Sequence, residues 1–307
     1  MRPYLQPYDD SADYWRVREF LREVYLLNGR RELAWSLLRW DYWRWHIHEN
    51  IFKFNLPEAV FLWEAGGRVA AVLNVDGPGE AFMQIHPAWP STELMREMLA
   101  LAEERLSQPN EAGGRGLRVW AGAAACEQQR LLAARRYQKG DGPEYQRRRP
   151  MSEPIADAPI PAGYTIRALG DESELPARSW VSWKAFHPRE PDERYQGWEW
   201  YRNVQRIPLY RRDLDIVAVT ASGEHAAFST AWFDDVTRSV VFEPVGTHPD
   251  HQRRGLGKAV MAEGLRRARR LGATQASVGS YSAAAHALYA SLGFVEYDLS
   301  EPWDKMW

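Results

Sequence analysis

Cysteine is nearly absent from this sequence, with Cys126 as the single copy among 307 residues. One cysteine cannot form a disulfide within the chain, and such usage is typical of proteins that fold in a reducing compartment. No apolar run reaches the roughly 18 residues that a membrane-spanning helix needs, and residues 1–10 lack the apolar stretch of a signal peptide. We therefore expect a soluble, cytoplasmic protein that makes no membrane contact.

An excess of either charge is missing too. The chain has 39 basic and 41 acidic side chains, which gives a formal net charge of −2. This balance produces no overall field that attracts nucleic acid, so none is expected as a partner. The basic run at Arg266, Arg267, Arg269 and Arg270 is interpreted as a solvated helix face, with contact to a nucleoside phosphate or an acidic partner as the alternative.

Tryptophan, in contrast, is abundant, with 15 copies. Trp35, Trp40, Trp43 and Trp45 fall in one segment whose spacing is helical. A buried aromatic core or a seam between helices is one interpretation, and an aromatic-lined pocket or a domain interface is the other. The two interpretations are compatible with each other.

The two halves of the chain repeat the same short patterns in the same order, which indicates a duplication. The matches are Trp43 and Trp45 with Trp198 and Trp200, residues 65–71 with 221–227, 85–87 with 247–249, and 136–137 with 293–294. Several prolines between residues 150 and 161 indicate an extended linker between the copies. We predict domains over residues 1–150 and 163–307, joined by a linker over residues 151–162.

The second copy reads as a hairpin followed by alternating helix and strand, which is typical of an α/β domain with a mixed sheet. The expected strands cover residues 164–167, 214–220, 226–233, 239–246 and 274–279, and the expected helical segments lie within 172–206 and over 257–271 and 283–292. Gly293 follows the last helix, where glycine is a common terminating residue.

The segment over residues 252–258 is the most informative one in the chain. It follows a strand and a His-Pro turn, and it precedes an amphipathic helix. A helix N-terminus presents free backbone N–H groups and a partial positive charge. Gly255 and Gly257 lack a Cβ atom and so permit close approach to the backbone, while two arginines and a lysine add cationic donors. The segment therefore predicts a site for a pyrophosphate. The P-loop pattern fits worse, because Ala259 stands where it needs Ser or Thr.

This segment resembles the Q/R-x-x-G-x-G/A motif of the GNAT superfamily of acyl-CoA N-acyltransferases, and residues 287–294 (ALYASLGF) are similar to its later Leu-Tyr-x-x-x-Gly-Phe motif. The resemblance covers residues 163–298. It implies two tandem GNAT-like domains, each a mixed, mainly antiparallel twisted sheet flanked by helices, an architecture similar to that of the mycothiol synthases. It also implies acetyl-CoA as cosubstrate, with no metal.

Cofactor contacts follow from the resemblance residue by residue. The backbone of the preceding strand end would bond the pantetheine arm, the glycine-rich segment would hold the pyrophosphate, and a serine stands where the family often has Asn. These residues are Val245, Gly246, Thr247, Gln252, Arg253, Arg254, Gly255, Leu256, Gly257, Lys258 and Ser282.

The first copy lacks the phosphate segment. Residues 88–92 contain neither glycine nor arginine, and Glu93 at the helix start would repel a pyrophosphate. Leu132 stands where the second copy has Tyr289. We expect a degenerate domain that acts as a scaffold, closes the acceptor pocket, or does both.

Two residues are candidates for the chemistry. Glu243 lies on the strand that leads into the phosphate segment and could remove a proton from the attacking amine, directly or through water; the alternative is a strand-end carboxylate paired with an arginine. By resemblance, Tyr289 would protonate the leaving thiolate, and the alternative is a tyrosine that packs against its neighbours. No covalent intermediate is expected, because Cys126 is interpreted as a small core residue of the degenerate half.

The leading prediction is an enzyme that acetylates a primary amine of a small molecule or peptide by direct attack on acetyl-CoA. The alternative from another class is a non-catalytic acyl-CoA-binding sensor or scaffold. A third, nucleic-acid binding through the arginine-rich helix, is disfavoured by the net charge. The sequence leaves the acceptor, the acyl length and the oligomeric state open.

Overall fold

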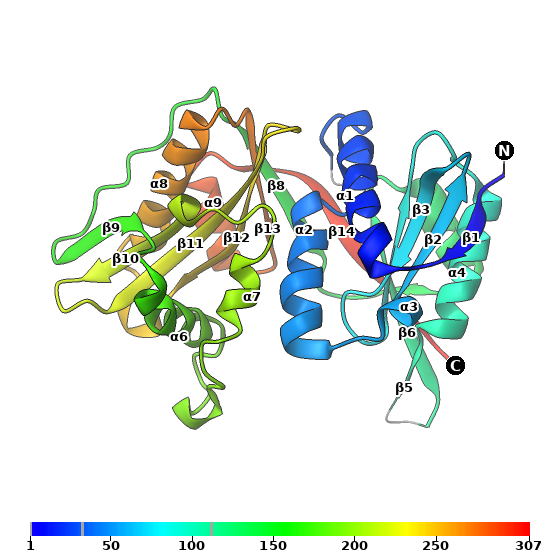
Figure 1. Cartoon of the computed structure of the whole chain (residues 1–307), viewed down its shortest axis with the longest axis horizontal. Helices are drawn as coiled ribbons and strands as arrows, with labels where there is room; N and C mark the ends of the chain where they lie inside the picture. The colour runs from blue at the N-terminus through cyan, green and yellow to red at the C-terminus, as the bar shows by residue number, and fades with distance from the viewer. Residues whose placement is uncertain (1, 32–33, 111–112) are drawn as a thin grey trace. The chain divides into compact units, whose positions relative to one another are not determined.

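The computed structural model describes residues 2–31, 34–110 and 113–307 (Figure 1). The chain divides into two compact units. The first comprises residues 1–145 together with 298–307, and the second comprises residues 146–297. The chain returns to the first unit at its end because the last strand pairs with two strands of that unit, β6 and β7.

This division differs from the predicted ranges in three places. Residues 298–307 were assigned by sequence to the second domain, whereas contacts place them in the first unit. Residues 146–150 were assigned to the first domain and residues 151–162 to a linker, whereas contacts place both in the second unit. The ranges 1–150, 151–162 and 163–307 remain our proposal for how the duplicated sequence is divided.

The first unit is a sheet with helices packed on it. Its helical segments are α1 (Asp10–Leu27), α2 (Leu37–Tyr42), a π-helix (Trp43–Phe52), α3 (Leu56–Ala59), α4 (Thr92–Arg105) and α5 (Cys126–Ala134). Its strands are β1 (Tyr4–Pro7), β2 (Val60–Ala65), β3 (Arg68–Asn74), β4 (Glu80–Ile85), β5 (Gln108–Pro109), β6 (Arg115–Gly122), β7 (Gln138–Lys139) and residues 298–306 of β14 (Val295–Met306). The sheet order is β1-β2-β3-β4-β6-β14, with β5 beside β6 and β7 beside β14.

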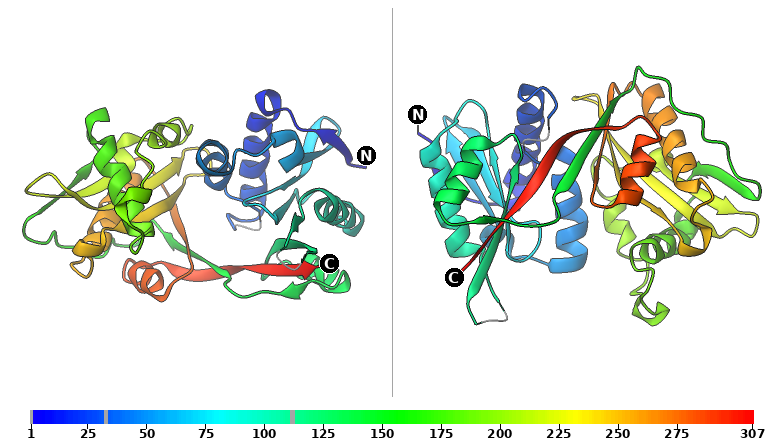
Figure 2. Two further views of the ribbon diagram at one scale, coloured as in Figure 1. Left: turned by 90° about the horizontal axis from the view of Figure 1, so that it is seen from below. Right: turned by 180° about the vertical axis from the view of Figure 1, so that it is seen from behind.

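The second unit repeats this plan. Its helices are α6 (Leu175–Phe186), α7 (Tyr201–Gln205), α8 (Leu256–Arg270) and α9 (Ala283–Ala290), with short 3₁₀ turns η2 (Glu172–Glu174), η3 (Asp192–Arg194), η4 (Arg212–Leu214) and η5 (Pro249–His251). Its strands are β8 (Glu144–Pro150), β9 (Tyr164–Ala168), β10 (Asp215–Thr220), β11 (His225–Asp234), β12 (Ser239–Thr247) and β13 (Gln275–Ser280). The order is β8-β13-β12-β11-β10-β9 (Figure 2).

The predicted fold class is confirmed in both units. Among the strand pairs whose register is described, all are antiparallel except β4 with β6 and β12 with β13, which are parallel. Both parallel pairs are short. The β12–β13 ladder runs from Ser239 to Val241, and the β4–β6 ladder runs from Glu80 to Phe82. The second half of each strand therefore diverges from its parallel neighbour, and the same opening of the sheet occurs in both copies.

Several matches between the copies also hold in three dimensions. The 65–71 and 221–227 patterns form the β2–β3 and β10–β11 hairpin turns, and both His-Pro turns end the diverging strands. After α5, Arg136 adopts a left-handed backbone with φ of 66°, and after α9, Gly293 does so with φ of 83°. The next residue, Tyr137 or Phe294, is buried in each case. The duplication thus preserved the helix end even where arginine replaces glycine.

Burial decides two of the sequence interpretations. Trp35, Trp40 and Trp43 are buried, and Trp45 packs against the same core, so the interpretation as an aromatic core is confirmed. The interpretation of Cys126 as a core residue is wrong. Its side chain is exposed at the first position of α5, whereas the buried residues of this helix, Leu131 and Leu132, lie further along it.

None of the helices in the described parts of the chain has the length and apolarity that crossing a bilayer requires.

Candidate active site

The end of β12 presents a free strand edge. Val245, Gly246 and Thr247 pair with β11 on one side, whereas the described pairing with β13 on the other side stops at Val241. The β11 register shifts opposite Glu243 and Pro244, which indicates a bulge in β12 beside the proline. Backbone groups of residues 245–247 that point away from β11 therefore face the opening between β12 and β13.

Gly246 is tightly packed between a side chain of β11 and the end of α6. A Cβ atom on Gly246 would lie 2.5 Å from Phe228 Cζ and 2.9 Å from Ala185 Cβ. Real Cβ atoms do not approach that closely, so only glycine fits between β11 and the end of α6. Helix α6 thus packs directly against the face of β12 at the residues that the sequence assigned to pantetheine.

The predicted phosphate segment forms an exposed bend before α8. After η5, Arg253 and Gly255 both have left-handed backbones, with φ of 62° and 83°. Gly255 is the N-cap of α8 and has open space where a Cβ would stand. Residues 252–255 are exposed, while Leu256 is buried and fixes the first turn of the helix to the core. The first amides of α8 therefore face solvent next to the diverging strand.

The three cations of this bend have different surroundings. Arg254 donates from Nη1 to the Tyr164 hydroxyl at 2.8 Å and from Nη2 to the Asp250 carbonyl at 3.1 Å. Within the described ranges, Arg253 and Lys258 have no ion-pair or hydrogen-bond partner. Arg253 and Lys258 are thus available to an anion, whereas both terminal nitrogens of Arg254 already donate hydrogen bonds within the protein.

Helix α9 brings the second predicted motif to the first. A Cβ on Gly257 would lie 3.4 Å from Leu288 Cδ2 and 3.5 Å from Thr247 Oγ1. The start of α8, the end of β12 and α9 therefore meet at one point. Ser282 is the N-cap of α9, and its Oγ accepts from the Ala285 N–H at 3.3 Å. The sequence predicted it as a cofactor contact, and the structure gives it this capping bond.

Tyr289 follows Leu288 and is buried, with its ring 6.2 Å from that of Phe294. Its burial, and then the charge of Glu243, raise the pKa of its hydroxyl to about 12. The hydroxyl has no hydrogen-bond partner in the described part of the chain. Glu243 is exposed, and its backbone carbonyl accepts from Trp232 Nε1. The two residues predicted for catalysis thus lie within electrostatic reach of each other.

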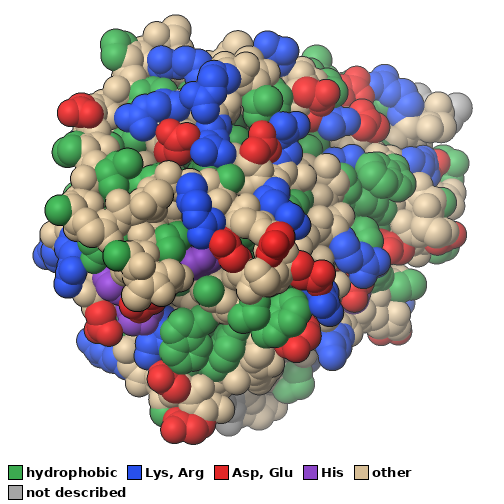
Figure 3. All heavy atoms as spheres, turned by 60° about the vertical axis from the view of Figure 1, so that its left-hand side comes forward, with side chains coloured by type: hydrophobic (Ala, Val, Ile, Leu, Met, Phe, Trp, Pro, Cys, Tyr) green, Lys and Arg blue, Asp and Glu red, His purple; other side chains and the backbone are tan. Residues whose placement is uncertain are grey.

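The surface around the site is mixed in charge. Figure 3 shows Lys and Arg side chains interspersed with Asp and Glu, and histidines beside an apolar patch. The arginine run on α8 is largely paired, because Glu263 lies 2.7 Å from Arg267, 3.6 Å from Arg266 and 3.9 Å from Arg270. This pairing fits a solvated helix face better than a phosphate site.

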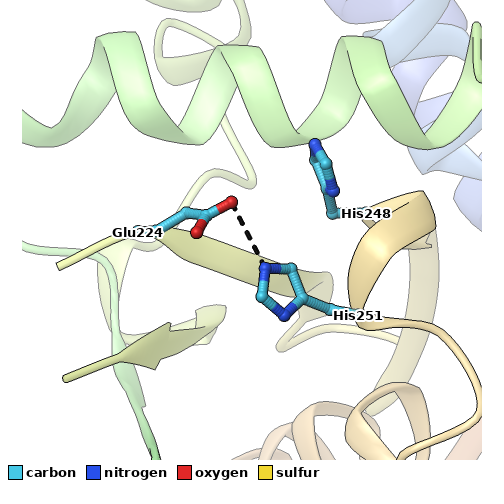
Figure 4. Close-up of side chains that lie close together, drawn as sticks. All are labelled: Glu224, His248 and His251. Carbon is cyan, nitrogen blue, oxygen red and sulfur yellow. Dashed lines mark ion pairs between the residues drawn. The ribbon is translucent and has the colours of Figure 1, made fainter. Parts of the chain in front are cut away.

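Sequence reasoning missed the residues beneath the phosphate bend. His248 precedes the η5 turn and His251 ends it, and a carboxylate lies beside them: Glu224 Oε1 is 3.2 Å from His251 Nε2 (Figure 4). The β11–β12 register brings these side chains together. Ala227 pairs with Thr247, so residues that precede Ala227 come to lie beside those that follow Thr247.

A second set that the sequence did not indicate is buried under α6. Arg178 Nε donates to Asp215 Oδ1 at 2.9 Å, and both side chains are fully buried. The other carboxylate oxygen of Asp215 accepts from the hydroxyls of Tyr201 and Tyr210. This network fixes α6 to β10, and so fixes the helix that covers Gly246.

Comparison with known proteins agrees with this geometry. The sequence model of the Acetyltransferase (GNAT) family matches residues 175–294. A mycothiol acetyltransferase from Saccharopolyspora erythraea is 28% identical over 251 residues, which cover 76% of this chain and 81% of the relative. The residues matched by the family model include α6, the diverging strand, the phosphate bend and α9.

Solved structures show the same fold along the whole chain. A GCN5-related N-acetyltransferase from Sphaerobacter thermophilus aligns with a TM-score of 0.68 at 15% identity, covering 99% of this chain and 95% of that one. A tandem GNAT protein from the clavulanic acid biosynthesis pathway aligns with a TM-score of 0.67 at 14% identity, covering 99% and 98%. The chain therefore has the fold of a tandem GNAT protein, and residues 175–294 of its second unit match the sequence of the Acetyltransferase (GNAT) family.

Proposed function

We propose that this protein is an N-acetyltransferase that transfers an acetyl group from acetyl-CoA to a primary amine of a small molecule or peptide by direct attack. One observation carries the proposal. A strand that diverges from its parallel neighbour after Val241 runs directly into an exposed bend with two unpaired cations at the start of α8. Tyr289 lies on the helix that meets this point.

The residues present suit coenzyme A. The free edge of residues 245–247 can bond an extended amide chain such as pantetheine, as a further strand would. The amides at the start of α8, with Arg253 and Lys258, suit the pyrophosphate. Gln252, Arg254, Gly255, Leu256 and Gly257 shape this bend, and Ser282 is proposed as a contact near the thioester end. No contact in this set requires a metal.

Glu243 is proposed as the base for the acceptor. An alkyl ammonium with a pKa of about 10.4 must lose its proton before it attacks, which costs roughly 4–5 kcal/mol near pH 7. An exposed carboxylate at the opening of the sheet can accept this proton directly or through one water molecule. The bulge at Glu243 and Pro244 places that carboxylate where β12 leaves β13.

Tyr289 is proposed as the acid for the leaving thiolate. With a pKa of about 12, its hydroxyl is protonated at any physiological pH and can donate to the sulfur. Complete transfer to a thiolate whose conjugate acid has a pKa of about 8.5 would be unfavourable by roughly 5 kcal/mol. The proton that Glu243 accepts removes the carboxylate charge, which is one cause of the raised pKa. Deprotonation of the amine therefore makes Tyr289 a stronger acid for the step that follows.

A thiol-release assay with acetyl-CoA and pooled amines, aminoglycosides and peptides tests the proposal. We expect acceptor-dependent release of coenzyme A, and the relative named for mycothiol favours small-molecule acceptors in the first pool. A sensor or scaffold would instead bind acetyl-CoA in calorimetry without turnover in any pool. The match to an acetyltransferase family favours the enzyme. Absence of acetyl-CoA binding in calorimetry would overturn the assignment of the phosphate bend.

A further inference from the structure

Three side chains with metal-binding atoms meet beneath the phosphate bend (Figure 4). Glu224 comes from the turn before β11, His248 directly follows β12, and His251 ends η5. One ligand atom from each lies within 4.8 Å of the others. Two of them are closer, with 3.2 Å between His251 Nε2 and Glu224 Oε1. The two histidines come from one segment and Glu224 from the turn before β11, and the β11–β12 register brings these two segments together.

We propose that Glu224, His248 and His251 bind one divalent transition-metal ion, with Zn²⁺ as the best match. Two imidazoles and one carboxylate form a ligand set that Zn²⁺ uses, with a fourth position left for water. Ligands about 2.0–2.1 Å from a tetrahedral ion lie about 3.3 Å from one another, close to the observed 3.2 Å separation. The third ligand atom needs to move by no more than about 1.5 Å to reach that spacing.

Tyr164 is placed to orient His251. The Nδ1 atom of His251 lies 2.8 Å from the Tyr164 hydroxyl. When Nε2 binds a metal, Nδ1 carries the proton and can donate it to the phenol oxygen, which also accepts from Arg254. Such a partner fixes the tautomer and the ring orientation of a metal-bound histidine.

His248 requires one rearrangement. In the present structure its Nδ1 accepts from the Asp250 N–H at 3.3 Å, while its Nε2 has no hydrogen-bond partner in the described residues. Metal binding at Nε2 would require a proton on Nδ1. The Asp250 carboxylate lies 3.9 Å from Nδ1 and is exposed, so a small movement of its side chain would let it accept that proton. The exchange would then replace one long hydrogen bond by a charge-assisted one.

Charges of both signs surround His248: Asp250 and Glu224 are negative, and Lys184 is positive. Lys184 repels a cation, so it reduces the affinity that the three ligands would otherwise give. The carboxylates of Glu224 and Asp250 outnumber this one positive charge.

A bound ion would fix the position of the segment that leads into the phosphate bend. It would link His248 and His251, which lie on either side of the η5 turn, to Glu224 in the β10–β11 turn. The phosphate bend begins at the next residue, Gln252. Through His251 and Tyr164 it would also act on Arg254. The cluster includes neither Glu243 nor Tyr289, so we assign the ion a structural role. This inference rests on the geometry of the cluster and does not depend on the proposed acetyl transfer.

The test uses untagged full-length protein, stripped with a chelator and titrated with Zn²⁺ in competition with a chromophoric chelator. We expect one Zn²⁺ per chain, with affinity at least tenfold weaker in Glu224→Gln and in His251→Gln. His187→Gln is the matched control, because His187 lies in the same unit outside the cluster and should leave uptake unchanged. Circular dichroism establishes that each variant is folded.

Two outcomes would overturn the inference: no uptake at micromolar Zn²⁺ by the unmodified chain, or equal uptake by the wild type and both cluster variants. A visible Co²⁺ spectrum gives a second readout, because four-coordinate and six-coordinate Co²⁺ differ strongly in intensity. The spectrum should be lost in His251→Gln and kept in His187→Gln. Neither readout requires acetyl-CoA, so failure here leaves the proposed acetyl transfer to be judged by its own assay.

Discussion

The carboxylate of Glu243 contributes, after burial, to raising the pKa of the Tyr289 hydroxyl to about 12. The proposed base and the proposed acid are therefore coupled: the protonation state of one changes the acidity of the other. Once Glu243 has taken a proton from the amine, its charge no longer raises the pKa of the Tyr289 hydroxyl. In the proposed mechanism, loss of the amine proton therefore favours the later proton transfer from Tyr289 to the thiolate.

Replacing the phenol by a phenyl ring tests the acid. In Tyr289→Phe we expect kcat to fall by about 10²-fold or more, because the thiolate must leave without a donor. The buried ring and its contact with Phe294 are kept, so acetyl-CoA affinity in calorimetry should match the wild type. An unchanged kcat would show that Tyr289 only packs against its neighbours.

The base is tested by pH dependence. In Glu243→Gln the acceptor amine must lose its proton to solvent, so the rate at pH 7 should drop while rising about tenfold per pH unit toward the amine pKa. The wild-type rate should rise less steeply over the same range. Steady-state turnover from pH 6 to 9 measures both profiles. Parallel profiles would instead support the interpretation of Glu243 as a strand-end carboxylate.

Gly257 separates folding from cofactor binding. The added Cβ of Gly257→Ala would make ordinary contacts with Leu288 and Thr247, at 3.4 and 3.5 Å, so the fold tolerates it. Alanine also favours the helix, so Tm should stay equal or rise slightly. The motif that this segment resembles has Gly or Ala at this position, so acetyl-CoA affinity in calorimetry should change little in Gly257→Ala. Gly257→Asp would instead place a carboxylate at the start of α8, where it repels a pyrophosphate. We expect this variant to bind acetyl-CoA at least tenfold more weakly, and equal affinity of the two variants would count against the proposed site.

The sequence predicted the second unit well because its signals are local. The hairpin over 215–234 and the helix after Gly255 each follow from periodicity and glycine positions within a short window. The whole of β14 was missed for the same reason. Its sequence contains Pro302 and several charges, so it lacks strand alternation. Residues 300–306 form a strand because β6 and β7 supply partners from far along the chain.

The candidate site was predictable only where a motif carries it. The phosphate bend is contiguous in sequence, and so it could be recognised as a unit. Glu224 approaches the histidines through the β11–β12 register, and Asp215 meets Arg178 through the packing of α6 on the sheet. No local pattern encodes either of these contacts. Cys126 shows the opposite error, because an alanine-rich context indicated burial where the first turn of a short helix faces solvent.

The buried pair beneath α6 should dominate the stability of the second unit. Removing the Asp215 charge leaves Arg178 buried without a counter-ion, which is typically worth about 3–5 kcal/mol. We expect Asp215→Asn to lower the free energy of unfolding by that order in urea titrations. The exposed pair of Arg211 and Asp213 is the matched control, and Asp213→Asn should change it by less than about 1 kcal/mol. Equal effects of the two variants would refute the role assigned to burial.

Acid should destabilise the fold through His225. Burial lowers the pKa of this histidine to about 4, opposed mainly by Glu174, from an ordinary value of 6.5. Between these values the unfolded chain binds a proton that the folded chain does not, so the free energy of unfolding falls as pH decreases from 6.5 to 4. The contribution is at most about 3 kcal/mol. Urea titrations of wild type and His225→Gln at pH 7, 5.5 and 4.5 measure it. The variant should lose less stability than the wild type, and parallel losses would contradict the assignment.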